Sequence, residues 1–148
     1  MQISAPIEQE IEKTIAGETA MGHVLNLCIG TDSQVHAGLI RFATVIVVLR
    51  KGKGGFMYVR SEGLKTRMSV RERMLCEVQR SLEVAYAISD IVTAYEIDLE
   101  VHADINTNAL FKSHDAFREA MGYVTGMGFA FKAKPHAFAS SCCADKMI

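Results

Sequence analysis

The sequence predicts an α/β protein built on a mixed sheet with helices on its faces. Apolar, β-branched segments joined by a glycine-rich turn come first in the chain. From Ser69 the apolar residues change to a helical period, and strand-like and helix-like patterns then alternate. Hairpin-joined strands followed by such alternation place antiparallel and parallel strands in one sheet. We therefore expect a five-stranded sheet with the order β-β-β-α-β-α-β-α, preceded by an extra N-terminal helix.

The composition is that of one globular unit. The chain has 148 residues, 49% of them hydrophobic and only two of them proline, which is enough to bury a core and argues against disorder. We take residues 1–22 as a helical extension and residues 23–148 as the main domain. The apolar run 43–49 is too short to span a bilayer. The first residues carry acids where an export signal carries bases, so the expected location is the cytoplasm.

The cysteines indicate thiols and not a disulfide framework. None of the four belongs to a C-x-x-C pair, and an unexported chain keeps its thiols reduced. The adjacent Cys142 and Cys143 could ligate a soft metal, but zinc sites need spaced ligands, so packing is the preferred role. The other two are Cys28 and Cys76.

Residues 4–61 are expected to contain one helix and three strands. Isoleucines repeat every four residues over 4–17, Pro6 suits the first turn, and Gly17 can end that helix. Strands are expected over 24–31, 40–50 and 55–61. The sequence "KGKGG" between the last two is typical of a hairpin turn.

A long helix is expected to begin at Ser69, where "SVRE" forms a capping box with Glu72. A strand over 96–104 follows it, then a helix over 114–126, a strand over 129–134 and a short final helix that carries Asp145. The apolar arc of the long helix contains Met74, Leu75, Val78, Leu82, Ala85 and Ile88.

Two acids follow apolar strands directly. Asp32, in "IGTDSQVH", and Asp104, in "VHADIN", are each expected at the C-terminal end of a strand. If those strands are parallel neighbours, the carboxylates emerge at the same edge of the sheet and must share a proton or a cation. Asp32 could instead only shape a turn by accepting bonds from nearby backbone amides.

Two further acids complete a candidate metal site. A helical wheel places Glu77 at the border of the buried arc and Glu83 toward solvent, and Asp145 lies on the last helix. Four carboxylates without a matching set of histidines and cysteines suit hard cations such as Mg²⁺ or Mn²⁺. Two such ions can activate water and stabilise the leaving oxygen in phosphodiester cleavage.

The charge is uneven along the chain. The formal net charge is −1, yet eight bases and only two acids lie between Arg50 and Arg73. This segment could line a phosphate-binding groove, with Lys65, Arg67 and Arg71 as backbone contacts, or it could be a solvated face.

Isolated polar residues give weaker signals. His36 and His102 could each orient a phosphate or move a proton, but a structural role is preferred for both; His36 is the better catalytic candidate, because it is expected on a loop after Asp32. Asn106 could hydrogen-bond substrate or shape a turn. Lys134 could contact a phosphate or lie on the surface.

Several stretches occur together in a characteristic order: "IGTDSQVH", "SLEVAYAI", "VHADIN", "GYVTGMGF", "KPHAFASS" and "ADK". With them the chain resembles the YkuK-type family of predicted ribonuclease H-like nucleases, from about Leu25 to Lys146. The resemblance implies a ribonuclease H-like fold for residues 23–148. It also implies that Asp32, Asp104, Asp145 and a glutamate on the first long helix occupy the acidic positions of that superfamily. Glu77 is the choice for the helix, and Glu83, in "SLE", is the rival.

The resulting hypothesis is a metal-dependent nuclease or phosphodiesterase that binds two Mg²⁺ or Mn²⁺ ions and acts on RNA, DNA or a hybrid. One alternative is a non-catalytic nucleic-acid or protein-binding module with the same fold. A phosphotransfer relative with an actin-like fold ranks last, because 148 residues leave no room for a second such domain. An exposed strand edge could also pair with a second copy as a homodimer.

Overall fold

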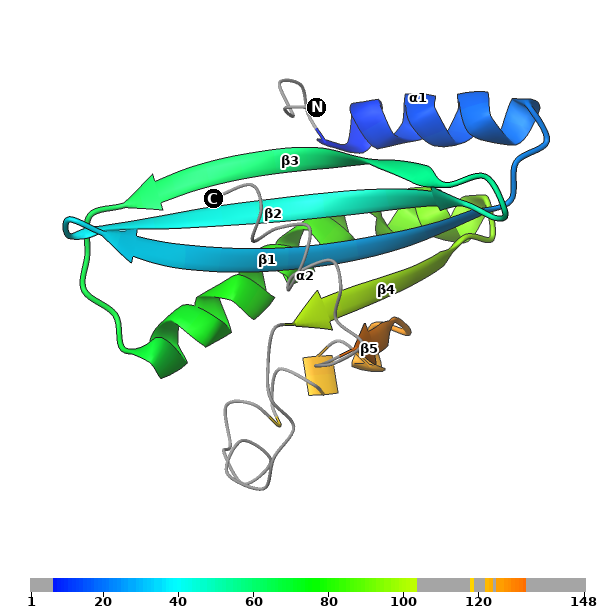
Figure 1. Ribbon diagram of the computed structural model, residues 1–148. Helices are drawn as coiled ribbons and strands as arrows, with labels where there is room; N and C mark the ends of the chain where they lie inside the picture. Colours follow the sequence, from blue (N-terminus) through cyan, green and yellow to red (C-terminus); the bar gives the residue numbers. More distant parts are fainter. Residues whose placement is uncertain (1–6, 104–117, 119–121, 124, 133–148) are drawn as a thin grey trace.

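The computed structural model describes residues 7–103, 118, 122–123 and 125–132. Two helices and a sheet make up this part of the chain (Figure 1). The helices are α1 (Ile7–Ala20) and α2 (Val70–Ala94), and the strands are β1 (Leu25–His36), β2 (Leu39–Arg50), β3 (Gly55–Leu64), β4 (Asp98–Ala103) and β5 (Ala130–Lys132).

The sheet is mixed, as the sequence predicts. Within the described residues its strands lie in the order β3-β2-β1-β4-β5. The first three pair antiparallel as two hairpins, whereas β1 with β4 and β4 with β5 pair parallel. Of the helix expected over 114–126, the described residues 118, 122–123 and 125–126 are helical. The final helix expected around Asp145 lies outside the described residues.

β1 is longer than its sequence pattern indicates. The expected strand ends at Thr31, but β1 continues through Asp32 to His36, and the whole of it pairs with β2. The chain turns at Ala37 and Gly38, whose φ angles are 52° and 77°. Two residues with positive φ form the hairpin turn that matches the twist of the flanking strands. Long-range pairing with β2 therefore overrides the polar character of "TDSQVH", and the expectation that the strand ends at Asp32 is wrong.

α1 also ends later than expected. The helix passes through Gly17 and stops at Ala20, and the backbone amides of Gly22 and His23 bond back to the carbonyls of Thr19 and Glu18. Gly22 has a φ of 83°, the left-handed conformation that commonly ends helices. The prediction that Gly17 ends the helix is therefore wrong. A glycine ends a helix where its backbone adopts the left-handed conformation, whereas a glycine inside a helix lowers helix stability by only about 1 kcal/mol.

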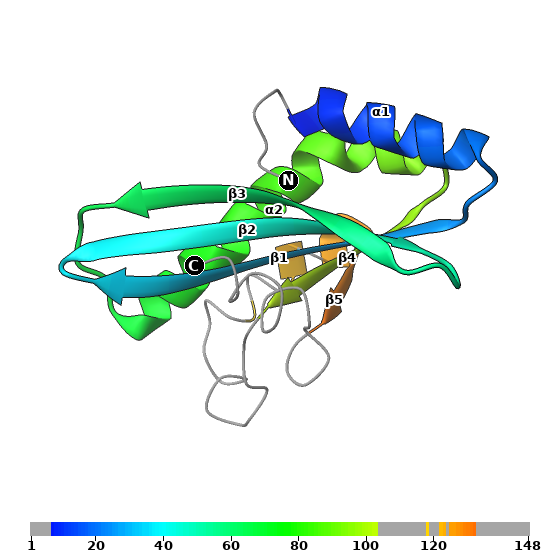
Figure 2. The same cartoon turned by 45° about the horizontal axis from the view of Figure 1, so that its top comes forward.

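α1 and α2 cover the same face of the sheet (Figure 2). Alternate residues of β1 point toward these helices, among them Leu27 and Ile29, and meet Ile11 of α1 and Ile88 of α2 in one hydrophobic core. α1 is therefore part of the main core. Cys28 points the other way and belongs to a smaller cluster on the opposite face.

The start of α2 is fixed by the capping box that the sequence predicts. The Ser69 side chain accepts a hydrogen bond from the Glu72 amide, and the Glu72 side chain accepts one from the Ser69 amide. Further along α2, the buried hydroxyl of Ser81 bonds to that of Thr31 on β1 at 2.7 Å. This pair fixes α2 across β1.

None of the described helices is long and apolar enough to cross a membrane.

Candidate functional site

The candidate site lies where β1 runs past the end of β4 (Figure 1). The last described pair between these two strands is Thr31 with Ala103. Asp32 is the next residue of β1, and on its other side it pairs with Ala43 of β2. The parallel arrangement assumed for the two acidic strands is thus present. Asp104 follows Ala103 in the sequence and lies outside the described residues.

Glu77 approaches this end of β1 from α2. Its carboxylate is half-buried, and its Oε2 accepts a hydrogen bond of 2.5 Å from the Ser33 hydroxyl. The Ser33 backbone amide donates to Oδ1 of Asp32 at 2.9 Å. Ser33 therefore touches both acids, one with its side chain and one with its backbone. Glu83 is exposed on the same helix, as the helical wheel indicates.

The electrostatics of Glu77 reflect this environment. Burial, with a smaller contribution from the negative charge of Asp32, raises the pKa of Glu77 to about 7. The hydrogen bonds from Ser33 and the positive charge of Arg73 act in the opposite direction. Arg73 also donates to the carbonyl and the hydroxyl of Ser33, both at 3.4 Å. Glu77 is thus partly protonated at neutral pH.

The donor set fits a hard divalent cation. Asp32 and Glu77 supply carboxylate oxygens from separate elements, and Ser33 donates to both, with its amide to Asp32 and its hydroxyl to Glu77. Oxygen donors of this kind are preferred by Mg²⁺ and Mn²⁺. A cation would offset both the burial of the charged carboxylate and the negative charge of Asp32, the two causes that raise the pKa of Glu77, so the residues present are suited to holding one.

Sequence reasoning missed two residues of this group. Ser33 directly follows Asp32, and its position next to a candidate metal ligand could have identified it as part of the site. Arg73 lies four positions before Glu77 on α2, the spacing at which helix side chains are neighbours. It was counted only as one base among eight.

His36 is not on a loop, contrary to the prediction. It is the last residue of β1, it is exposed, and it pairs with Leu39. Four residues of extended strand separate its Cα from that of Asp32 by about 13 Å. His36 therefore lies at the far end of β1 and is not a neighbour of Asp32.

The basic segment forms two separate groups in the structure. Arg50, Lys51 and Lys53 lie at the turn between β2 and β3, where the Arg50 guanidinium forms two hydrogen bonds of 2.7 Å with Glu18. The exposed Lys65 and Arg67 follow the far end of β3, whose ten residues span about 33 Å, and Arg71 is exposed in the first turn of α2. A single groove formed by the whole segment is therefore wrong.

Three other predicted site residues fall outside the part of the chain that the structure describes. They are Asn106, Lys134 and Asp145. Their roles remain predictions from the sequence.

Comparison with known proteins places the chain in a class. A family model described as "Ribonuclease H-like" matches residues 7–148, so the chain belongs to the ribonuclease H-like family. More particularly, it is 30% identical over 134 residues to "Uncharacterized protein YkuK" of Bacillus subtilis (strain 168). This alignment covers 81% of this chain and 77% of YkuK. The resemblance noted in the sequence is thereby confirmed. Ribonuclease H1 from the halophilic archaeon Halobacterium salinarum NRC-1 aligns with a TM-score of 0.42 and 15% identity, over 83% of this chain and 99% of that one.

Proposed function

We propose that this protein is a divalent-metal-dependent nuclease that hydrolyses phosphodiester bonds in nucleic acid. One observation carries the proposal: Asp32 of β1 and Glu77 of α2, which are far apart in the sequence, meet through Ser33 at the point where β4 ends. The family supports the fold of such an enzyme. The reaction itself is our inference from the site.

In this proposal Asp32 and Glu77 hold metal together with Asp104 and Asp145. Two Mg²⁺ or Mn²⁺ ions, when bound, supply an activated water and stabilise the leaving oxygen. Ser33 and Arg73 act as positioning residues, because they orient the Glu77 carboxylate and favour its charged form. The raised pKa of Glu77 means that metal binding must release a proton near neutral pH.

The charges near the site support nucleic acid as the substrate class. Arg73 touches Ser33, so the first turns of α2 lie beside the acids, and Arg71 is exposed in the same turns. Lys65 and Arg67 precede these turns in the connection from β3. We assign these three exposed bases to the phosphate backbone of the substrate, and Asn106 and Lys134 to further contacts.

Calorimetric titration of Mn²⁺ tests the metal site without any assumption about substrate. We expect saturable binding to the wild-type protein and a loss of more than about tenfold in affinity for Asp32→Asn and for Glu77→Gln. Glu83→Gln is the matched control, because Glu83 is an exposed acid on the same helix. Equal loss with Glu83→Gln, or full binding by Asp32→Asn, would refute the assigned ligands.

A cleavage assay then separates catalysis from binding. Labelled RNA, DNA and hybrid duplexes are incubated with the protein and Mn²⁺, and Asp32→Asn is expected to abolish turnover while it retains nucleic-acid binding. If the wild-type protein binds both Mn²⁺ and nucleic acid but cleaves nothing, the non-catalytic binding module is the correct function.

A further inference from the structure

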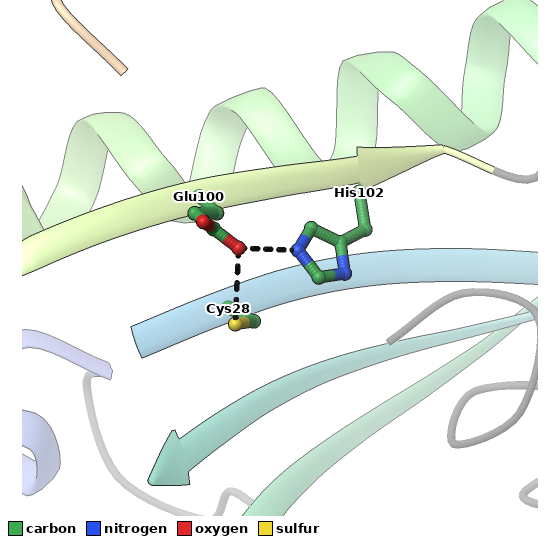
Figure 3. A group of neighbouring side chains, drawn as sticks. All are labelled: Cys28, Glu100 and His102. Carbon is green, nitrogen blue, oxygen red and sulfur yellow. Dashed lines mark hydrogen bonds and ion pairs between the residues drawn. The ribbon is translucent and has the colours of Figure 1, made fainter. Parts of the chain in front are cut away.

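Three side chains of the types that ligate transition metals meet on the face of the sheet opposite α2. Cys28 comes from β1, and Glu100 and His102 come from β4 (Figure 3). Cys28 and Glu100 are direct partners in the parallel register, and His102 lies two residues further on, so that it projects from the same face. The pairing of β1 with β4 therefore brings together residues that are more than seventy positions apart.

The distances within this group match a metal site. The Cys28 Sγ lies 3.7 Å from Oε2 of Glu100, and Nε2 of His102 lies 2.9 Å from the same oxygen. All three ligand atoms lie within 4.8 Å of one another. Metal–ligand bonds of about 2.0–2.3 Å in a tetrahedral zinc site place neighbouring ligand atoms about 3.3–3.8 Å apart. The Cys28–Glu100 distance of 3.7 Å already lies in that range, and the His102–Glu100 distance of 2.9 Å is shorter by about 0.4 Å.

Burial and chemistry favour a specific cation. Cys28 and His102 are each only 2% exposed, whereas Glu100 is half-buried and reaches toward solvent. Beside Cys28 lies the small apolar cluster that contains Val45, Val47 and Val59. A sulfur, an imidazole nitrogen and a carboxylate oxygen form a donor set that suits Zn²⁺ and is unlike the all-oxygen set at Asp32.

We propose that Cys28, Glu100 and His102 form a Zn²⁺ site that is separate from the carboxylate site. Asp32 lies four residues beyond Cys28 along β1, a Cα separation of about 13 Å. Bound zinc would connect β1 to β4, the strand that leads into Asp104. Three protein ligands leave a fourth coordination position open. The same three side chains could otherwise form only a hydrogen-bonded network, and the two cases differ in their response to metal.

Titration of the full-length protein with Co²⁺ and then Zn²⁺ distinguishes them. We expect one Co²⁺ per chain to produce a sulfur-to-cobalt charge-transfer absorption in the near ultraviolet, and Zn²⁺ to displace it. Cys28→Ser should abolish this absorption. Cys76→Ser is the matched control and should retain it, because Cys76 is a thiol on α2, where it contacts Met68.

Variants of the other two ligands keep the test decisive if Cys28→Ser fails to fold. Glu100→Gln and His102→Gln should each weaken Zn²⁺ binding by more than about 100-fold, with an unchanged circular dichroism spectrum. Their Mn²⁺ titration should match that of the wild type, which separates this proposal from the nuclease site. Absence of the absorption in the wild type would overturn the proposal. So would its persistence in Cys28→Ser, or its loss only in the Cys142→Ser/Cys143→Ser double variant.

Discussion

Glu77 is a half-buried acid whose charge depends on three neighbours. Its pKa is raised to about 7, mainly by burial and in smaller part by Asp32, while Ser33 and Arg73 favour the carboxylate. The folded state therefore binds a proton more tightly than the unfolded chain, where the ordinary value is 4.5. This difference links the candidate site to stability.

The first prediction concerns stability as a function of pH. Because the pKa of Glu77 is higher in the folded state, its stabilising contribution is complete below about pH 4.5 and is lost as pH rises to about 7. The free energy of unfolding should fall by up to about 3 kcal/mol across that window. Glu77→Gln should remove this dependence and be the more stable protein at pH 8, as measured by urea unfolding in chelator. Glu83→Gln should behave as the wild type, and a persistent slope in Glu77→Gln would contradict the assignment.

The second prediction tests the neighbours of Glu77 separately. Asp32→Asn removes a negative charge and should lower the pKa of Glu77, whereas Ser33→Ala removes a hydrogen bond to the carboxylate and should raise it. The side-chain carboxyl carbon of Glu77, followed by NMR titration, reports both shifts. If Ser33→Ala lowers the pKa of Glu77, as Asp32→Asn is expected to do, then Ser33 does not stabilise the charged form of Glu77.

At the scale of elements, α1 is attached to the sheet by a polar cluster as well as by its isoleucines. Glu18, near the end of α1, accepts two hydrogen bonds from Arg50 of β2 and one of 2.5 Å from His23. Thr14 forms a further hydrogen bond with Tyr58 of β3. The hydrogen bond from Arg50, followed by that from His23, lowers the pKa of Glu18 to about 2.

The third prediction follows from this cluster. Because the pKa of Glu18 is depressed in the folded state, its contribution to stability is present above about pH 4.5 and is lost as pH falls toward 2. Glu18→Gln should lower Tm at pH 7, and the difference from the wild type should shrink on acidification. Glu12→Gln, an exposed position on α1, is the control and should leave Tm nearly unchanged. A constant difference between pH 7 and pH 2 would show that Glu18 acts by packing alone.

At the scale of the whole molecule, most bases of the segment from Arg50 to Arg73 lie in two groups at opposite ends of β3. One group lies at the turn between β2 and β3, and the other lies between β3 and the start of α2, close to the candidate site. Under the proposed function, the second group is the one that would guide a nucleic-acid backbone toward Asp32 and Glu77.

The fourth prediction compares these two groups. In duplex DNA binding, each phosphate contact contributes about 0.9 to the slope of log affinity against log salt. Lys65→Gln/Arg67→Gln/Arg71→Gln should therefore reduce the slope by up to about 3, whereas Lys51→Gln/Lys53→Gln at the opposite end should leave it unchanged. Fluorescence anisotropy over a salt series measures both. If both variants reduce the slope equally, the positive charges attract nucleic acid without forming a defined binding site.

Local patterns predicted most elements because they are local in origin. The capping box at Ser69 and the β-branched run of β2 depend on neighbouring residues, and both are present as expected. Errors arose where a distant strand decided the outcome. β1 continues past Thr31 because β2 is long enough to pair with it, and nothing within "DSQVH" signals that partner.

The sequence by itself determined the order of the described elements and the mixed sheet, but it placed Asp32 at the end of a strand, whereas Asp32 lies within β1. Periodicity also placed Glu77 at a buried border and Glu83 in solvent, because it fixes which face of one element is apolar. Only the tertiary structure decided which faces meet: Glu77 with Ser33 beside Asp32, and Cys28 with Glu100 and His102. These meetings depend on the register of β1 with β4 and on the docking of α2 across β1. Both are set by packing between segments distant in the chain, which no local pattern encodes.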